Sequence, residues 1–197
     1  MTPTAHHTAP PTAPPTAPDT APHAEPDTEP DAAPRWSGRP RTPEDTDAVL
    51  AMFTEPDFYY RTDRPDTRSE AEILRLLDDD TRLLLADGRP AGLYAVQAAG
   101  AAHGCHYQVE LRLTGEAPLA WWVSAYRELV RALRWEREVV RIALPLHEFD
   151  DRGLRFARAA GLTEEGTLAQ VTARGGGRHG RVFFARIFPP ERTGAPR

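Results

Sequence analysis

The segment from Glu110 to Ala117 carries the residues with the clearest chemical potential. It reads Glu-Leu-Arg-Leu-Thr-Gly-Glu-Ala and lies between an apolar strand and an amphipathic helix that opens at Pro118. Gly115 and Ala117 are small enough to let the backbone approach an anion. The first N–H groups of a helix have no partner inside it, and the helix dipole favours negative charge there. The segment from Arg112 to Ala117 therefore predicts a pyrophosphate-binding loop.

Hydrophobic periodicity and turn residues predict the elements that position this loop. Strands are expected over residues 35–41, 81–86, 91–98, 106–111, 139–144, 168–172 and 181–188. Helices are expected from Thr42 to Phe53, after a capping box at Thr67–Glu70, from Pro118 to about Trp135, and from a cap at Asp150 to a stop at Gly161. A glycine-rich tip, residues 175–180, joins the last two strands.

Length, charge and composition restrict the classes of protein open to this chain. Its 197 residues suffice for one domain with a sizeable core. Five of the 29 acidic residues and none of the 24 arginines lie in residues 1–34, so the remainder is neutral and unlike a nucleic-acid-binding surface. The single cysteine, Cys105, excludes an internal disulfide and a cysteine zinc cluster, and we expect no metal. No run suits a membrane span or a secretory signal, which favours the cytoplasm.

The composition divides the chain into a tail and a domain. Residues 1–34 consist mainly of Pro, Thr and Ala and hold half of the 20 prolines. Such a segment has little apolar surface to bury, so we expect it to be disordered. The folded domain is expected over residues 35–190, and residues 191–197 are expected to be frayed.

The predicted element order is similar to that of the GNAT superfamily of acyl-CoA-dependent N-acyltransferases, and the resemblance covers residues 36–188. Arg112, Gly115 and Ala117 fit the superfamily's R/Q-x-x-G-x-G/A motif, and about twenty residues separate it from the next strand. Residues 150–166 resemble the "N-x-x-S … G-F-x-x-E-G" segment of the branch that acetylates ribosomal-protein N-termini, antibiotics and small amines. The resemblance implies an α/β fold with a central mixed, mostly antiparallel, twisted sheet of about seven strands flanked by four helices.

Three positions depart from the superfamily pattern. Asp150 stands where asparagine is usual, and Glu116 adds a negative charge inside the loop. Ala157 replaces a tyrosine that often protonates the leaving thiolate. In an alternative register the strand continues to Leu113 and truncates the loop. We prefer the register in which the loop begins at Arg112, because it preserves the downstream spacing.

The resemblance implies acetyl-CoA, or another acyl-CoA, as co-substrate. It assigns the acyl-CoA to residues on the fourth strand, the loop and the fourth helix, namely Val109, Leu111, Arg112, Leu113, Thr114, Gly115, Ala117 and Asp150. Acyl transfer to an amine also needs a base and donors for the oxyanion. Glu110 is the first candidate base and His106 the second. Because side chains alternate along a strand, one of His106 and Tyr107 is expected to point into the cleft.

The acceptor pocket of this fold lies between the loop that joins the first two helices and the last hairpin. Those segments contribute Phe58, Tyr59, Tyr60, Arg178 and His179, which suit an acceptor with a flat or apolar part and a carboxylate or phosphate. The implied function is N-acetylation of a primary amine, on a small molecule or a protein N-terminus. The amine attacks the thioester directly in a ternary complex, and the protein is expected to be a monomer or homodimer. The alternative is a GNAT-fold binding or regulatory subunit, or an enzyme with another acyl carrier.

Overall fold

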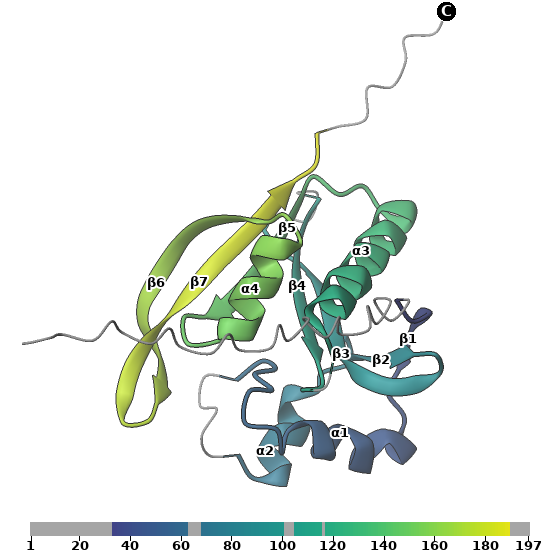
Figure 1. Ribbon diagram of the computed structural model, residues 1–197, viewed down its shortest axis with the longest axis vertical. Coiled ribbons are helices and arrows are strands. Elements are labelled where there is room, and N and C mark those ends of the chain that lie inside the picture. Colours follow the sequence, from purple (N-terminus) through teal and green to yellow (C-terminus); the bar gives the residue numbers. More distant parts are fainter. Residues whose placement is uncertain (1–32, 63–67, 101–104, 116, 190–197) are drawn as a thin grey trace, which may run out of the picture. The chain divides into compact units, whose positions relative to one another are not determined.

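The centre of the protein is a twisted seven-stranded sheet (Figure 1). The computed structural model describes residues 33–62, 68–100, 105–115 and 117–189. Within these ranges the strand order is β1-β2-β3-β4-β5-β7-β6, and β4 and β5 are the only neighbours of the seven that run parallel. The strands are β1 (Trp36–Pro40), β2 (Arg82–Ala86), β3 (Arg89–Ala98), β4 (His106–Leu113), β5 (Arg141–His147), β6 (Thr163–Arg174) and β7 (Gly177–Ile187).

Among the described residues, four α-helices and one short 3-10 helix flank the sheet. They are η1 (Pro43–Asp45), α1 (Thr46–Met52), α2 (Glu70–Leu76), α3 (Leu119–Glu136) and α4 (Asp151–Ala159). Figure 1 shows α3 and α4 side by side, with α1 and α2 together in a separate layer. The fold class predicted from the sequence is therefore confirmed, including the number of strands and the mostly antiparallel pairing. Within the described ranges, no helix is long and apolar enough to cross a membrane.

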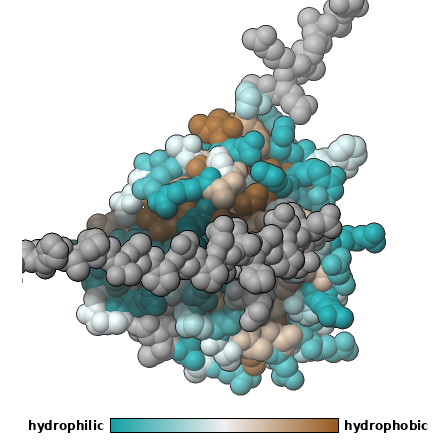
Figure 2. All heavy atoms as spheres, in the orientation of Figure 1, coloured by the Kyte–Doolittle hydropathy of each residue, from teal (hydrophilic) through white to brown (hydrophobic). Residues whose placement is uncertain are grey.

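Alternation along β4 divides the core into two clusters. The odd-numbered residues from Tyr107 to Leu113 belong to the cluster that α3 and α4 cover, which includes Trp122 and Phe156. The other cluster joins α1 and α2 to Leu83 and Leu93 of the sheet. The even-numbered residues of β4 face this second side. The face shown in Figure 2 is mostly hydrophilic, with hydrophobic residues in small separate groups.

β4 and β5 are paired at one end and diverge toward the other. The place where they part is called the fork below. Their parallel pairing runs from His106 opposite Arg141 to Gln108 opposite Ala143. Beyond that point β4 stays paired with β3, and β5 with β7. The N–H of Thr114 donates to the Ala91 carbonyl, so even-numbered residues of β4 turn their backbone groups toward β3. The backbone of the odd-numbered Leu111 therefore faces the gap between β4 and β5.

The structure corrects several expected boundaries. β4 continues to Leu113, so the preferred register, with the loop beginning at Arg112, is wrong. The ladder to β3 holds this extension in place, because Arg112 and Leu113 pair with Leu93 and Gly92. β6 and β7 are also longer than expected, and only Gly175 and Gly176 form the turn, both at positive φ.

Helix caps were predicted with mixed success. The N-cap of α2 is Ser69, which forms a capping box with Glu72, rather than the predicted box at Thr67–Glu70. Asp150 caps α4 as predicted, since its carboxylate accepts the Gly153 N–H. Thr67, Glu116, most of the N-terminal tail and residues 190–197 lie outside the described residues.

Candidate functional site

A polar pocket of about 260 Å³ lies at the fork, on the side of the sheet away from α3 and α4. Three even-numbered residues of β4, Gln108, Glu110 and Arg112, enter it, together with residues of β5 and β7 and residues of the connection after α1. Its lining is Tyr59, Arg61, Asp78, Gln97, Gln108, Glu110, Arg112, Pro145, His147 and Arg181. Charged and amide groups thus converge where the two central strands part.

Glu110 is the buried carboxylate of this lining. It is only 9% exposed, and Gln108 Nε2 donates to its Oε1 at 3.3 Å. Burial raises the pKa of the Glu110 carboxyl above its usual value, and the charges of Arg112, Arg181 and Arg61 oppose that rise. A carboxylate with a raised pKa is better matched to accepting a proton near neutral pH than an exposed glutamate.

His147, the last residue of β5, lines the same pocket as a neutral imidazole. It is 3% exposed, and its Nδ1 lies 3.1 Å from the Thr172 hydroxyl. Burial, assisted by the charges of Arg181 and Arg112, lowers the pKa of His147 to about 3. Its ring stacks on Phe149, with centroids 4.9 Å apart. His147 therefore adds a fixed, uncharged wall beside Glu110.

The other two candidate catalytic residues on β4 are placed differently. Tyr107 lies in the hydrophobic cluster under α3, on the side of the sheet opposite the polar pocket. His106 is exposed at the start of β4, where the strand is still paired with β5. The structure therefore brings Glu110 into the pocket and leaves both His106 and Tyr107 outside its lining.

The residues predicted to bind the acceptor also divide into those that line the pocket and those that do not. Tyr59 lines the pocket, and its ring packs edge-on against His147 and Phe149. Phe58 and Tyr60 belong instead to the core under α1 and α2, where both pack against Phe53.

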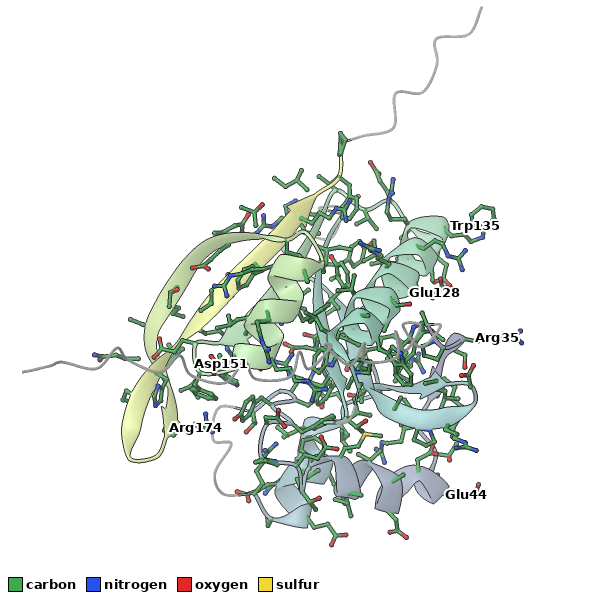
Figure 3. The ribbon with its side chains drawn as sticks, viewed as in Figure 1. Arg35, Glu44, Glu128, Trp135, Asp151 and Arg174 are labelled. Carbon is green, nitrogen blue, oxygen red and sulfur yellow. The ribbon has the colours of Figure 1, made fainter. Side chains whose placement is uncertain are left out.

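The hairpin of β6 and β7 reaches the same group of rings. His179 packs edge-on against Phe149, and its Nδ1 lies 3.2 Å from Glu148. Arg178 is exposed on β7. Arg174, labelled in Figure 3, lies over the rings of Tyr59 and Phe149. No sequence pattern identifies Arg174 or Arg181, because their position depends on how the hairpin pairs with β5.

Arg112 and Asp150, both predicted to hold the cofactor, are paired with each other. Arg112 Nη2 lies 3.0 Å from Asp150 Oδ2, and the two side chains are 2% and 3% exposed. The Arg112 Nε and Nη1 donate to the carbonyls of Tyr59 and Leu111, each at 2.9 Å. Asp150 also accepts the Gly153 N–H at the start of α4. This buried pair therefore joins β4, α4 and the connection after α1 beneath the site.

The β4–α3 loop, residues 114–118, contains other residues that were predicted to bind the cofactor. Gly115 is exposed, and its N–H donates to the carboxylate of Glu55. The N–H of Ala117 donates to the Thr114 carbonyl and closes a turn. The side chains of Val109, Leu111 and Leu113 are buried in the core, so these residues offer only backbone groups to a ligand.

Arg152 is the cation next to this loop. Its Nη2 donates to the carbonyls of Thr114 and Ala117, at 3.0 Å for Thr114. Its guanidinium lies over the Trp122 ring, 4.9 Å from the ring centroid. Arg152 was not among the predicted site residues. Its position two residues after the Asp150 cap places it in the first turn of α4, and this was a signal that could have identified it.

The interface under α3 offers a test of fit for a long, amide-containing ligand. The ring nitrogens of Trp121 and Trp122 and the hydroxyl of Tyr126 are buried and find no hydrogen-bond partner among the described residues. All three belong to α3, and burial raises the pKa of Tyr126 to about 12. Buried polar atoms normally have a partner, but these groups are enclosed by packed rings, Trp121 against Trp36 and both Trp122 and Tyr126 against Phe156, so they do not by themselves show room for a pantetheine-like arm. Ala157 offers no hydroxyl there and is fully buried.

Comparison of the chain with known proteins identifies its fold. No protein-family model and no curated protein sequence matches the chain. Among solved structures, RimL, the ribosomal L7/L12 alpha-N-protein acetyltransferase in complex with coenzyme A, is 14% identical, with 77% of this chain and 93% of that chain covered and a TM-score of 0.63.

Two further structures are similar. The ribosomal-protein-alanine N-acetyltransferase from Brucella melitensis is 19% identical over 77% of this chain and 99% of that chain, with a TM-score of 0.59. YncA from Salmonella typhimurium, described as a putative acetyltransferase with its cofactor acetyl-CoA, is 11% identical over 82% and 98%, with a TM-score of 0.60. At these identities the comparisons establish that the chain has the fold of the GNAT acetyltransferases.

Proposed function

We propose that this protein is an acyl-CoA-dependent N-acyltransferase that transfers an acetyl group to a primary amine. The observation that carries the proposal is the position of Glu110. It is a buried carboxylate with a raised pKa at the point where β4 and β5 separate, in a fold whose solved examples include complexes with CoA and acetyl-CoA.

The reaction follows from the groups around the fork. Glu110 accepts one proton from the incoming ammonium group, and the neutral nitrogen then attacks the thioester carbonyl. The backbone N–H of Leu111 faces the gap and can donate to the developing oxyanion. The C–N bond forms, the C–S bond breaks, and the second proton lost by the nitrogen protonates the departing thiolate. The products are an amide and a free thiol.

The pocket also restricts the acceptor. A volume of about 260 Å³ suits an amine-bearing end group rather than a bulky molecule. RimL and the Brucella melitensis enzyme are named as ribosomal-protein acetyltransferases. We therefore infer a small primary amine or the first residue of a protein N-terminus as acceptor. The tyrosine wall and the pocket arginines would contact its remaining part.

A binding or regulatory protein is the second candidate function. The observation in its favour is the carboxylate of Glu55 on the Gly115 N–H, because a pyrophosphate needs the same donor. This candidate predicts that acetyl-CoA is not consumed in the presence of any amine.

Turnover separates the two functions. The protein is incubated with acetyl-CoA and a panel of primary amines and short peptides with free N-termini, and the free thiol released is measured. We expect amine-dependent thiol release by the wild type and a large loss in Glu110→Gln. Thiol release that does not depend on an amine, or is equal in both proteins, would contradict the proposal.

A further inference from the structure

The β4–α3 loop holds a carboxylate of the chain itself at its exposed glycine. Glu55 follows α1, and its side chain accepts the N–H of Gly115, a residue 60 positions later in the sequence. A Cβ added to Gly115 would stand 3.1 Å from Glu55 Oε2, so the carboxylate lies directly against the loop. The loop thus already binds an anion through the donor that a pyrophosphate would use.

Arg152 completes the surroundings of this carboxylate. The same Cβ position at Gly115 lies 3.9 Å from Arg152 Nη1. Nη1 also lies 3.9 Å from Asp57 Oδ2, while Nη2 is engaged by the loop carbonyls. The guanidinium is therefore held by Trp122 and the loop, and turns its other nitrogen toward the acidic side chains that follow α1.

We propose that Gly115 and Arg152 form one anion site, that Glu55 fills it in the free protein, and that the pyrophosphate of acyl-CoA binds by displacing Glu55. A phosphate oxygen that accepts the Gly115 N–H has to stand where Glu55 Oε2 stands. Two anions at this distance repel each other, so the carboxylate and the pyrophosphate exclude one another. Glu55 is a competitor of the ligand, and Arg152 is the cation that serves both anions.

The local structure allows the exchange without unfolding. The backbone of Glu55 is fixed by turn hydrogen bonds, from its own N–H to the Met52 carbonyl and from the Phe58 N–H to its carbonyl. Its side chain is half-buried and Gly115 is exposed, so rotation of the side chain moves the carboxylate into solvent. Arg152 keeps its contacts with Trp122 and the loop carbonyls throughout.

This inference rests on the proposed function, and calorimetry tests the two separately. Wild type, Glu55→Gln and the control Glu44→Gln are each titrated with CoA and with pantetheine, which lacks the pyrophosphate. Glutamine keeps the shape of Glu55 and an acceptor for the Gly115 N–H but removes the charge. Glu44 is an exposed acid on η1, at the other end of α1 (Figure 3).

We expect Glu55→Gln to bind CoA at least about fivefold more tightly than wild type, since a repulsion in partly exposed surroundings is removed. Binding of pantetheine by Glu55→Gln, and of both ligands by Glu44→Gln, is expected to match wild type. Equal or weaker CoA binding by Glu55→Gln, with wild type still binding CoA, would overturn the exchange and leave the proposed function standing. Absence of CoA binding in all three proteins would overturn both.

Discussion

The polar pocket and the β4–α3 loop both place an arginine beside a carboxylate, but they differ in exposure and in how firmly their groups are held. In the pocket, Glu110 is 9% exposed and Arg112 is 2% exposed, with Arg112 bound to two carbonyls and Asp150. On the loop, Gly115 is exposed and the Glu55 carboxylate is half-buried. The pocket is thus arranged in advance for proton transfer, whereas the loop can exchange one anion for another.

Arg112 and Arg152 illustrate this difference. The sequence pattern selects Arg112 as the pyrophosphate ligand, yet its guanidinium is enclosed under the site. Arg152, which no pattern selects, is the arginine that touches the loop. A buried ion pair costs much to break, while a partly exposed arginine contributes less to the fold and more to a ligand.

Glu110→Gln has the largest expected effect and tests the pocket. We expect kcat to fall by about 10² to 10⁴, the usual contribution of a general base, with little change in CoA affinity. Because the pKa of Glu110 is raised, wild-type kcat/KM should decline on acidification from a pH above the ordinary glutamate range. Initial rates measured across a range of pH for both proteins give kcat and kcat/KM and so test both effects. An acidic limb that persists unchanged in the variant would exclude Glu110 as the base.

Arg112→Met tests the pair that joins the two regions. Removal of Arg112 leaves the Asp150 charge buried without compensation, and we expect a loss of about 3 to 5 kcal/mol in the free energy of unfolding. Urea denaturation provides the measurement. The double variant Arg112→Met with Asp150→Asn keeps a capping side chain on α4 and should regain part of that loss. An Arg112→Met protein of wild-type stability that loses only CoA binding would make Arg112 a ligand.

Arg152→Gln tests the loop. We expect CoA binding to weaken about tenfold, in line with the loss of one charge-assisted hydrogen bond. Pantetheine binding should change far less. Arg155→Gln is the matched control, since Arg155 is an exposed arginine on the same helix. Equal loss of affinity for CoA and pantetheine would indicate a general disturbance of the loop.

Tyr59→Leu has the smallest expected effect and tests the acceptor wall. The variant keeps the backbone carbonyl that binds Arg112 and replaces only the ring beside His147. We expect KM for the amine to rise several-fold with unchanged CoA affinity. Tyr60→Phe is the neighbouring control. It loses a hydrogen bond to Thr81, at a cost of about 1 kcal/mol in stability, without a change in KM. An unchanged KM in Tyr59→Leu would remove this ring from the acceptor site.

Local patterns predicted much of the fold. The period of the apolar residues on α3, the Asp87-Gly88 turn and the Asp150 cap are encoded within a few residues, and the structure contains each of them. The position of Glu110 on β4 followed from the same local reasoning, although its catalytic role stays a prediction.

Long-range contacts explain what the sequence did not predict. The continuation of β4 to Leu113 depends on β3, and the partner of Arg112 lies across the fork on α4. Glu55 reaches Gly115 from a segment 60 residues earlier. Such contacts arise from the packing of whole elements and leave no short pattern in the chain.

Titration of the wild-type protein with acetyl-CoA, followed by calorimetry, tests the central claim most directly. The account predicts saturable binding with a dissociation constant between about 1 μM and 1 mM, the range typical of enzyme substrates. It also predicts that Glu110→Gln binds acetyl-CoA as the wild type does, because Glu110 lies on the acceptor side of the sheet. Absence of binding by the folded wild-type protein at millimolar acetyl-CoA would contradict it.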